Sequence, residues 1–185
     1  MNIYVFYEEL RELDKSSEHL NSNIISLISK EMNVSTADIQ DITLMKNGMT
    51  NRSFRFSYKG KKYIMRIPGE GTDKLINRRN EYSVYQALRG NSITDKVVYM
   101  SADNGYKITE YWDDARVCDP FDAKDVKLCM QLLRSFHESK IYVSHTFDLF
   151  EQIEFYESLW DGKPSIFIDY FETKEKVLSL KPIIE

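Results

Sequence analysis

An arginine inside an otherwise apolar segment points most clearly to chemistry in this sequence. Arg66 lies in the segment Tyr63-Ile64-Met65-Arg66-Ile67, which predicts a β-strand that ends at Pro68. A guanidinium buried there alone would cost several kcal/mol, so Arg66 should have an anionic partner. A strand cation held by a carboxylate is suited to binding the phosphate groups of a ligand.

Glu81 is the carboxylate that we expect beside Arg66. It lies in a helix predicted from about residue 72 to residue 89, and apolar residues follow it at i+3, i+4 and i+7 (Val84, Tyr85 and Leu88). Residues at these spacings share a helix face, so Glu81 should point inward rather than into water. The alternative is that Arg66 is an edge-strand charge and Glu81 a solvated helix residue.

A glycine-containing turn comes before this pair, in the segment Asn47-Gly48-Met49-Thr50-Asn51. Gly48 would allow the backbone N–H groups of the turn to approach phosphate oxygens closely, and Thr50 and Asn51 could add side-chain donors. The alternative is a plain hairpin turn, for which Asn-Gly is the commonest signal. The segment lacks the Gly-x-Gly-x-x-Gly pattern of protein kinases, so the phosphate interpretation depends on Arg66 and Glu81.

The elements that must position these residues follow one another in an informative order. Strands are predicted at 39–46, 53–59, 63–67, 96–102 and 106–112, and the helix at 72–89 lies between the third and the fourth. Further helices are predicted at 17–32 before the strands and near 126–137, 147–160 and 165–185 after them, the last of which should end at Pro182. This order is that of an α+β fold: a protein-kinase-like small lobe with a five-stranded antiparallel sheet and one packed helix, followed by the first helices of a large lobe. Order alone leaves other α+β folds open, so the residues named above must decide between them.

Composition excludes several other classes of protein. The net charge of −4 and the pI near 5.5 argue against a nucleic-acid partner, which usually requires a basic face. Cys118 and Cys129 form neither a zinc pattern nor a disulfide framework, and they suit a reducing cytosol. The sequence has neither a signal peptide nor an apolar run of about 18 residues. We therefore expect a cytoplasmic protein that does not insert into membranes.

Three segments together resemble the bacterial choline kinase family, part of the wider choline/ethanolamine kinase and aminoglycoside phosphotransferase group. They are residues 48–51, residues 63–69 and residues 76–81, and the family has Arg rather than Lys at the strand position of Arg66. Segments 132–137 and 147–159 are also similar to its first large-lobe helices. The resemblance implies ATP and Mg²⁺ as cofactors and choline or ethanolamine as the small-molecule substrate. It also implies nucleotide binding by Gly48, Met49, Thr50, Asn51, Arg66 and Glu81.

The same resemblance assigns the connection after the fifth strand. Residues 108–112 would form the hinge between the two lobes, where Glu110, Tyr111 and Trp112 contact adenine largely through their main chain. The alternative is a strand end with interfacial aromatic residues, and both interpretations are compatible.

The catalytic residues of the family have no counterpart in this sequence. The family supplies its base from a His-x-Asp loop, and none of His19, His137 and His145 has an aspartate two residues later. The segment Ile168-Asp169-Tyr170-Phe171-Glu172 resembles the family's metal-binding segment, but it has an extra residue before the acid and fits a helix better. We therefore assign no catalytic residue and no metal ligand, and expect the Mg²⁺ ligands in a C-terminal part that this chain lacks.

These observations predict three parts of the chain: an N-terminal helical extension at 1–38, a nucleotide-binding small lobe at 39–112, and the start of a large lobe at 113–185. The chain is then the front part of a kinase, inactive as a fragment. Its large-lobe helices should expose apolar residues such as Met130 and Leu133, which would promote self-association. The alternatives are an aminoglycoside or sugar kinase of the same fold, or a non-catalytic nucleotide-binding or regulatory lobe.

Overall fold

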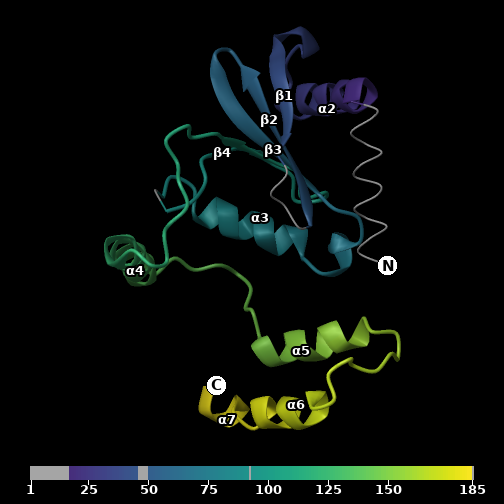
Figure 1. Ribbon diagram of the computed structural model, residues 1–185, viewed down its shortest axis with the longest axis vertical. Helices are drawn as coiled ribbons and strands as arrows, with labels where there is room; N and C mark the ends of the chain where they lie inside the picture. Colours follow the sequence, from purple (N-terminus) through teal and green to yellow (C-terminus); the bar gives the residue numbers. More distant parts are fainter. Residues whose placement is uncertain (1–16, 46–49, 92, 185) are drawn as a thin grey trace. The chain divides into compact units, whose positions relative to one another are not determined.

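The chain folds into two compact units, Met1–Tyr142 and Val143–Glu185 (Figure 1). The structure is a computed structural model, and it describes residues 17–45, 50–91 and 93–184. The first unit contains a β-sheet with helices, and the second contains helices α5, Leu149–Ser158, α6, Tyr170–Leu178, and α7, Lys181–Ile184. The boundaries of the lobes predicted from the sequence stay a prediction.

One antiparallel sheet organises the first unit, and its strand order is β1-β2-β3-β5-β4. The strands are β1 (Ile39–Met45), β2 (Asn51–Tyr58), β3 (Lys61–Pro68), β4 (Val97–Met100) and β5 (Lys107–Glu110). A hairpin turn at Lys59 and Gly60, both with positive φ, joins β2 to β3. The predicted five-stranded sheet is therefore confirmed, and pairing between β3 and β5 brings the third predicted strand beside the fifth.

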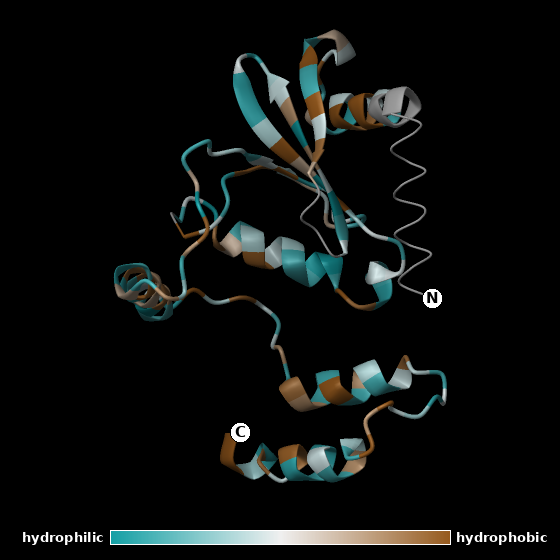
Figure 2. Ribbon diagram, in the orientation of Figure 1, coloured by the Kyte–Doolittle hydropathy of each residue, from teal (hydrophilic) through white to brown (hydrophobic). Residues whose placement is uncertain are grey.

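The alternation of side chains along the strands gives the sheet two different faces. Tyr63, Met65 and Ile67 of β3 are buried in the apolar core, together with residues of β2 and β5. Helix α2 (Ser17–Met32) covers this face, and its Ile24 and Ile28 belong to the same core. Figure 2 shows the hydrophobic residues alternating with hydrophilic ones along these strands. The residues between them on β3, Ile64 and Arg66, consequently point to the other face.

Helix α3 (Arg78–Ala87) follows β3 and carries Glu81. We predicted a helix from about residue 72, and that start is wrong. Residues Thr72–Lys74 form a separate 3₁₀ turn, η2, and α3 begins only after Asn77, whose side chain accepts a hydrogen bond from the Asn80 N–H at 3.1 Å. Asparagine is a preferred N-cap because its oxygen binds an N–H group that the first turn leaves without a partner.

A buried lysine ties α3 to the sheet. Lys107 of β5 is 6% exposed, and its Nζ donates to the Tyr85 hydroxyl at 2.7 Å and to Asp95 at 2.8 Å. The ammonium also lies 4.3 Å from the centroid of the Tyr85 ring, within the range of a cation–π contact. Lys107 and Arg66 occupy paired positions on β5 and β3, so both cations lie on the α3 side of the sheet.

The helices that follow expose much of their apolar surface. Helix α4 (Ala123–Glu138) includes Met130, which is 55% exposed, and Leu133, which is 44% exposed, as expected from the sequence. Figure 2 shows hydrophobic residues on α4 and on the helices of the second unit. The helix predicted over 165–185 is wrong at both ends, because α6 starts only at Tyr170 and Pro182 lies inside the short α7. Proline is tolerated in a first helical turn, where its missing N–H has no partner to lose.

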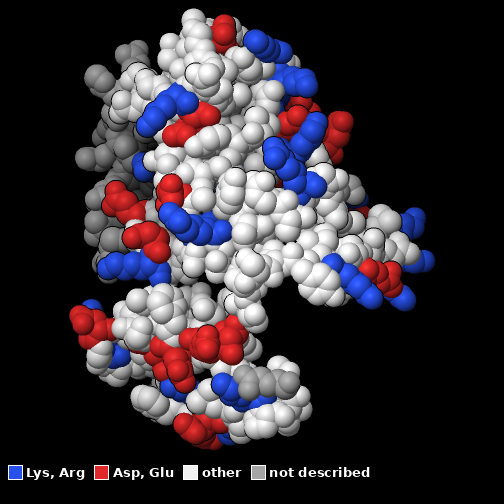
Figure 3. Space-filling view, turned by 180° about the vertical axis from the view of Figure 1, so that it is seen from behind, with Lys and Arg blue, Asp and Glu red and all other residues white. Residues whose placement is uncertain are grey.

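No described helix has the length and apolarity that a membrane-spanning segment requires. On the face drawn in Figure 3, acidic and basic side chains of the described residues are interspersed, without an extended basic field.

Candidate nucleotide-binding site

Arg66 and Glu81 form the ion pair that the sequence predicts. Nη2 of Arg66 donates to Oε1 of Glu81 at 2.7 Å, and the two side chains are 18% and 19% exposed. The same Nη2 also donates to the carbonyl oxygen of Gly105 at 3.2 Å. The structure thus brings together β3, α3 and the turn before β5, which are separated by up to 39 residues along the chain.

A second arginine, which the sequence analysis missed, binds the other oxygen of the same carboxylate. Nη1 of Arg78 donates to Oε2 of Glu81 at 3.0 Å, and Nη2 of Arg78 donates to Oγ1 of Thr72 at 2.7 Å. The side chain of Arg78 is 8% exposed, so this arginine is more deeply buried than Arg66. The signal available in the sequence was its place three residues before Glu81, on the same helix face.

The charges around Glu81 keep it ionised. Burial pushes the pKa of the Glu81 carboxyl upward, but the hydrogen bonds and charges of Arg66 and Arg78 outweigh burial and leave that pKa below its ordinary value. One carboxylate therefore lies between two guanidinium groups at neutral pH, which leaves the cluster with a formal net charge of +1.

The turn after β3 connects this cluster to the residue that precedes β2. Oγ1 of Thr72 donates to the carbonyl oxygen of Gly69 at 2.7 Å, and the N–H of Gly69 donates to the carbonyl oxygen of Thr50 at 2.9 Å. Thr50 and Asn51 are thereby held at the same end of the sheet as Arg66. The other two residues expected in the phosphate loop, Gly48 and Met49, lie outside the described residues.

Two buried side-chain atoms in the described part of the chain have no hydrogen-bond partner, and both belong to predicted site residues. They are Nε of Arg66 and Oδ1 of Asn51. Asn51 pairs with Pro68 and Ser53 pairs with Arg66, so Asn51 lies on the same sheet face as Arg66. A phosphate oxygen would satisfy Nε of Arg66. Rotation of the Asn51 amide by half a turn would present its NH₂ group instead of its oxygen to the same ligand.

The three residues expected at the hinge lie together, and the sheet uses two of their backbone donors. The Glu110 N–H donates to the Lys96 carbonyl oxygen at 3.0 Å, and the Tyr111 N–H donates to the Lys62 carbonyl oxygen at 2.9 Å. Within the described ranges the N–H of Trp112 has no such partner, and the Trp112 side chain is 55% exposed. The Trp112 N–H is therefore the donor at this connection that remains for a ligand.

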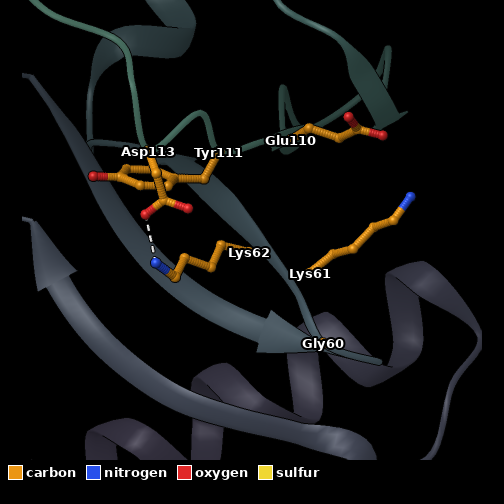
Figure 4. A pocket seen from close by; sticks show the side chains of 6 residues that line it. All are labelled: Gly60, Lys61, Lys62, Glu110, Tyr111 and Asp113. Carbon is orange, nitrogen blue, oxygen red and sulfur yellow. Dashed lines mark hydrogen bonds and ion pairs between the residues drawn. The ribbon is translucent and has the colours of Figure 1, made fainter.

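A cavity of about 300 Å³ lies beside the hinge, lined by Gly60, Lys61, Lys62, Glu110, Tyr111 and Asp113 (Figure 4). An ion pair between Lys62 and Asp113 borders it. Lys62 and Arg66 are four residues apart on β3, which corresponds to roughly 13 Å along a strand. The cavity is therefore adjacent to the hinge and distinct from the Arg66 cluster.

No group of three or more His, Cys, Asp or Glu side chains in the described ranges could hold a metal ion. In the segment 168–172, which resembles a metal-binding segment, Ile168 is fully exposed and Glu172 pairs with Lys176 at 2.6 Å along α6. Among the residues that the structure describes, none therefore forms a set that fits Mg²⁺.

Comparison with known proteins gives several relatives, although no model of a known protein family matches the chain. The protein LicA of Haemophilus influenzae is 26% identical over 124 residues, which are 65% of this chain and 36% of that protein. The choline kinase LicA of Streptococcus pneumoniae has a similar structure, with a TM-score of 0.74 and 26% identity over 90% of this chain and 57% of that chain. A structure of LicA in complex with AMP is also similar, with a TM-score of 0.65 and 25% identity over 86% of this chain and 56% of that chain.

The chain thus spans between 36% and 57% of the length of the relatives that it matches. Its strand order and the pairing of a strand arginine with a helix glutamate agree with the kinase-like small lobe expected from the sequence. The chain is thus similar to the N-terminal part of bacterial choline kinases, and it shares their protein-kinase-like fold.

Proposed function

We propose that this chain is the nucleotide-binding part of a small-molecule kinase that transfers a phosphoryl group from ATP to the hydroxyl group of choline or ethanolamine. One observation carries the proposal: Glu81 orients Arg66, and the buried Nε of Arg66 has no hydrogen-bond partner within the described residues. A buried donor without a partner is rare and costly, and a phosphate oxygen would satisfy it.

The two ends of the site suit the two ends of a nucleotide. Arg66 and the residues at the start of β2 would bind the phosphates, and the Trp112 N–H at the hinge would donate to the adenine edge. The likeness to a LicA structure that holds AMP supports a nucleotide at this site. The roles of Gly48 and Met49 in the phosphate loop belong to the same proposal.

The remaining parts of the reaction are assigned to residues outside this chain. We place the catalytic base and the ligands of Mg²⁺ in the C-terminal part of the enzyme, because no described cluster fits a metal ion. A phosphoryl-transfer enzyme needs that ion to neutralise charge on the phosphates. The exposed free thiols of Cys118 and Cys129 support a cytoplasmic location.

Binding of ATP and of adenosine to the chain tests the nucleotide site. We expect ATP to raise the unfolding temperature, and the Arg66→Met variant to lose this protection while binding adenosine as before. Loss of hydrogen bonds to a charged group should weaken ATP binding roughly tenfold to a hundredfold. Arg134→Met is the matched control, because Arg134 is 82% exposed on α4. Equal ATP protection of Arg66→Met and the unmodified chain would overturn the phosphate role.

The acceptor requires a separate experiment on the coding sequence that follows Glu185 in the source genome. A continuing reading frame with His-x-Asp and a downstream Asn would supply the protein for an acceptor screen. We expect ATP consumption with choline or ethanolamine in that screen. Turnover of an aminoglycoside or a sugar instead would show that the proposed acceptor is wrong, and the proposal of a small-molecule kinase would stand.

A further inference from the structure

We infer that Arg78 is a positioning residue for the nucleotide phosphates. It holds Glu81 so that this carboxylate neutralises Arg66 only in part and leaves positive charge for the ligand. It also links Glu81 to the turn at Gly69. This inference rests on the proposed nucleotide site. Arg78 does not face the ligand in this role, and it acts through Glu81 and Thr72.

The division of the Glu81 carboxylate between two arginines is the first argument. A carboxylate that bound Arg66 with both oxygens would neutralise it as a bidentate pair. Here only Oε1 binds Arg66, because Oε2 accepts from Arg78 at 3.0 Å. The cluster keeps one positive charge, and Nε of Arg66 is left without a partner. Arg78 thereby keeps Arg66 available for an anion.

The second argument is that Arg78 is fixed in place on several sides. Nη2 of Arg78 donates to Thr72, and the backbone of Gly105 packs against its side chain. A Cβ on Gly105 would lie 2.6 Å from Cδ and 2.8 Å from Nε of Arg78, so only glycine fits there. A guanidinium held this closely can fix the orientation of Glu81.

The third argument is the continuous path from Arg78 to the start of β2. The Thr72 hydroxyl, which accepts from Arg78, donates to the Gly69 carbonyl oxygen, and the Gly69 N–H donates to the Thr50 carbonyl oxygen. Movement of Arg78 would therefore disturb both the carboxylate that orients Arg66 and the backbone at Thr50.

Considered only as part of helix α3, Arg78 occupies a position that is unfavourable for a positively charged side chain. It is the first residue of α3, where the helix dipole disfavours a cation. The neighbouring Arg79 shows the usual arrangement for an arginine at such a place, because it is 81% exposed and pairs with the exposed Asp103. Arg79 is therefore a matched control, one residue away and with the same charge.

The test compares dissociation constants for ATP and adenosine in the intact chain and in Arg78→Met, Thr72→Val and Arg79→Met. The ratio of the two constants does not depend on the folded fraction, since both ligands require the folded chain. We expect the preference for ATP over adenosine, measured as the ratio of the two dissociation constants, to fall about tenfold in Arg78→Met. Thr72→Val should lose part of it, and Arg79→Met should keep it.

The outcomes separate this inference from the proposed function. If Arg66→Met loses the preference for ATP and Arg78→Met keeps it, the positioning role is wrong and the nucleotide site stands. If Arg78→Met does not fold, the nearly isosteric Thr72→Val decides, and an unchanged ratio in that variant overturns the role. If the unmodified chain shows no preference for ATP, the proposed function fails, and this inference fails with it.

Discussion

The N–H of Gly69 donates to the carbonyl oxygen of Thr50 at 2.9 Å, and this contact leaves no room for a side chain on Gly69. A Cβ there would lie 2.2 Å from the Thr50 oxygen. The contact joins the residue that follows β3 to the residue that precedes β2, beside the predicted phosphate loop.

Gly69→Ala should therefore disturb the phosphate end of the site through a steric conflict. We expect a loss of about 1–3 kcal/mol in the free energy of unfolding, the usual cost of overpacking, together with a weaker preference for ATP over adenosine. Gly90→Ala is the control for the ATP preference, because a Cβ there meets no atom within 4 Å and any stability that it loses comes from its φ of +83°. Calorimetry of both variants checks this, and an ATP preference in Gly69→Ala equal to that of the control would contradict it.

Glu81→Gln should destabilise the chain at neutral pH and much less in acid. The pKa of Glu81 is lowered in the folded state, so its contribution is complete above the ordinary value near 4.5 and is lost as the pH falls through the folded pKa. We expect a loss of roughly 1.5–3 kcal/mol at pH 7, the range for hydrogen bonds to a charged group.

Urea unfolding at pH 7 and at several values below 4.5 measures this difference between the unmodified chain and Glu81→Gln. Glu138→Gln is the control, because Glu138 is 65% exposed and pairs with Arg134 along α4. A stability gap for Glu81→Gln that stays constant into acid would show that its charge is not what stabilises the fold. Glu81→Gln should also weaken ATP binding less than Arg66→Met, since Glu81 acts through Arg66.

Tyr99→Phe should loosen helix α2 from the edge of the sheet. The Tyr99 hydroxyl donates to the carboxylate of Glu31, and burial, helped by that carboxylate, raises the pKa of Tyr99 to about 12. The neutral hydroxyl thus contributes stability below pH 10, the ordinary pKa, and this contribution is lost between about pH 10 and 12.

We expect Tyr99→Phe to lose about 0.5–1.5 kcal/mol at pH 8, with faster amide exchange in α2. The gap in stability should shrink as the pH rises above 10. Tyr142→Phe is the control, since Tyr142 is 81% exposed. Unchanged exchange in α2 of Tyr99→Phe would mean that the apolar core alone holds the helix.

Leu133→Lys should reduce self-association of the chain. Met130 and Leu133 are exposed on one stripe of α4, and exposed apolar stripes promote association. We expect light scattering to show dimers or larger species for the unmodified chain and fewer for Leu133→Lys. Gln131→Lys adds the same charge on the other side of the helix and should leave association unchanged. A monodisperse monomer for the unmodified chain would contradict the prediction.

Local patterns were sufficient for the parts of the fold that depend on neighbouring residues. The period of two in β3 separates Met65 from Arg66, and the spacing of apolar residues after Glu81 places this carboxylate on the inner side of α3. The start of α3 was not predictable in the same way. The 3₁₀ turn at Thr72–Lys74 and the Asn77 cap interrupt a segment that the sequence predicts as one continuous helix.

The sequence by itself determined that Arg66 needs an anion and that Glu81 could supply it, because strand alternation and helix periodicity are set by adjacent residues. Only the tertiary structure decided that Arg78 shares this carboxylate, that Gly105 must be glycine to make room for Arg78, and that the sheet uses the Glu110 and Tyr111 donors. These contacts join residues that the chain brings together only when β3, α3 and β5 pack, and no local pattern records them.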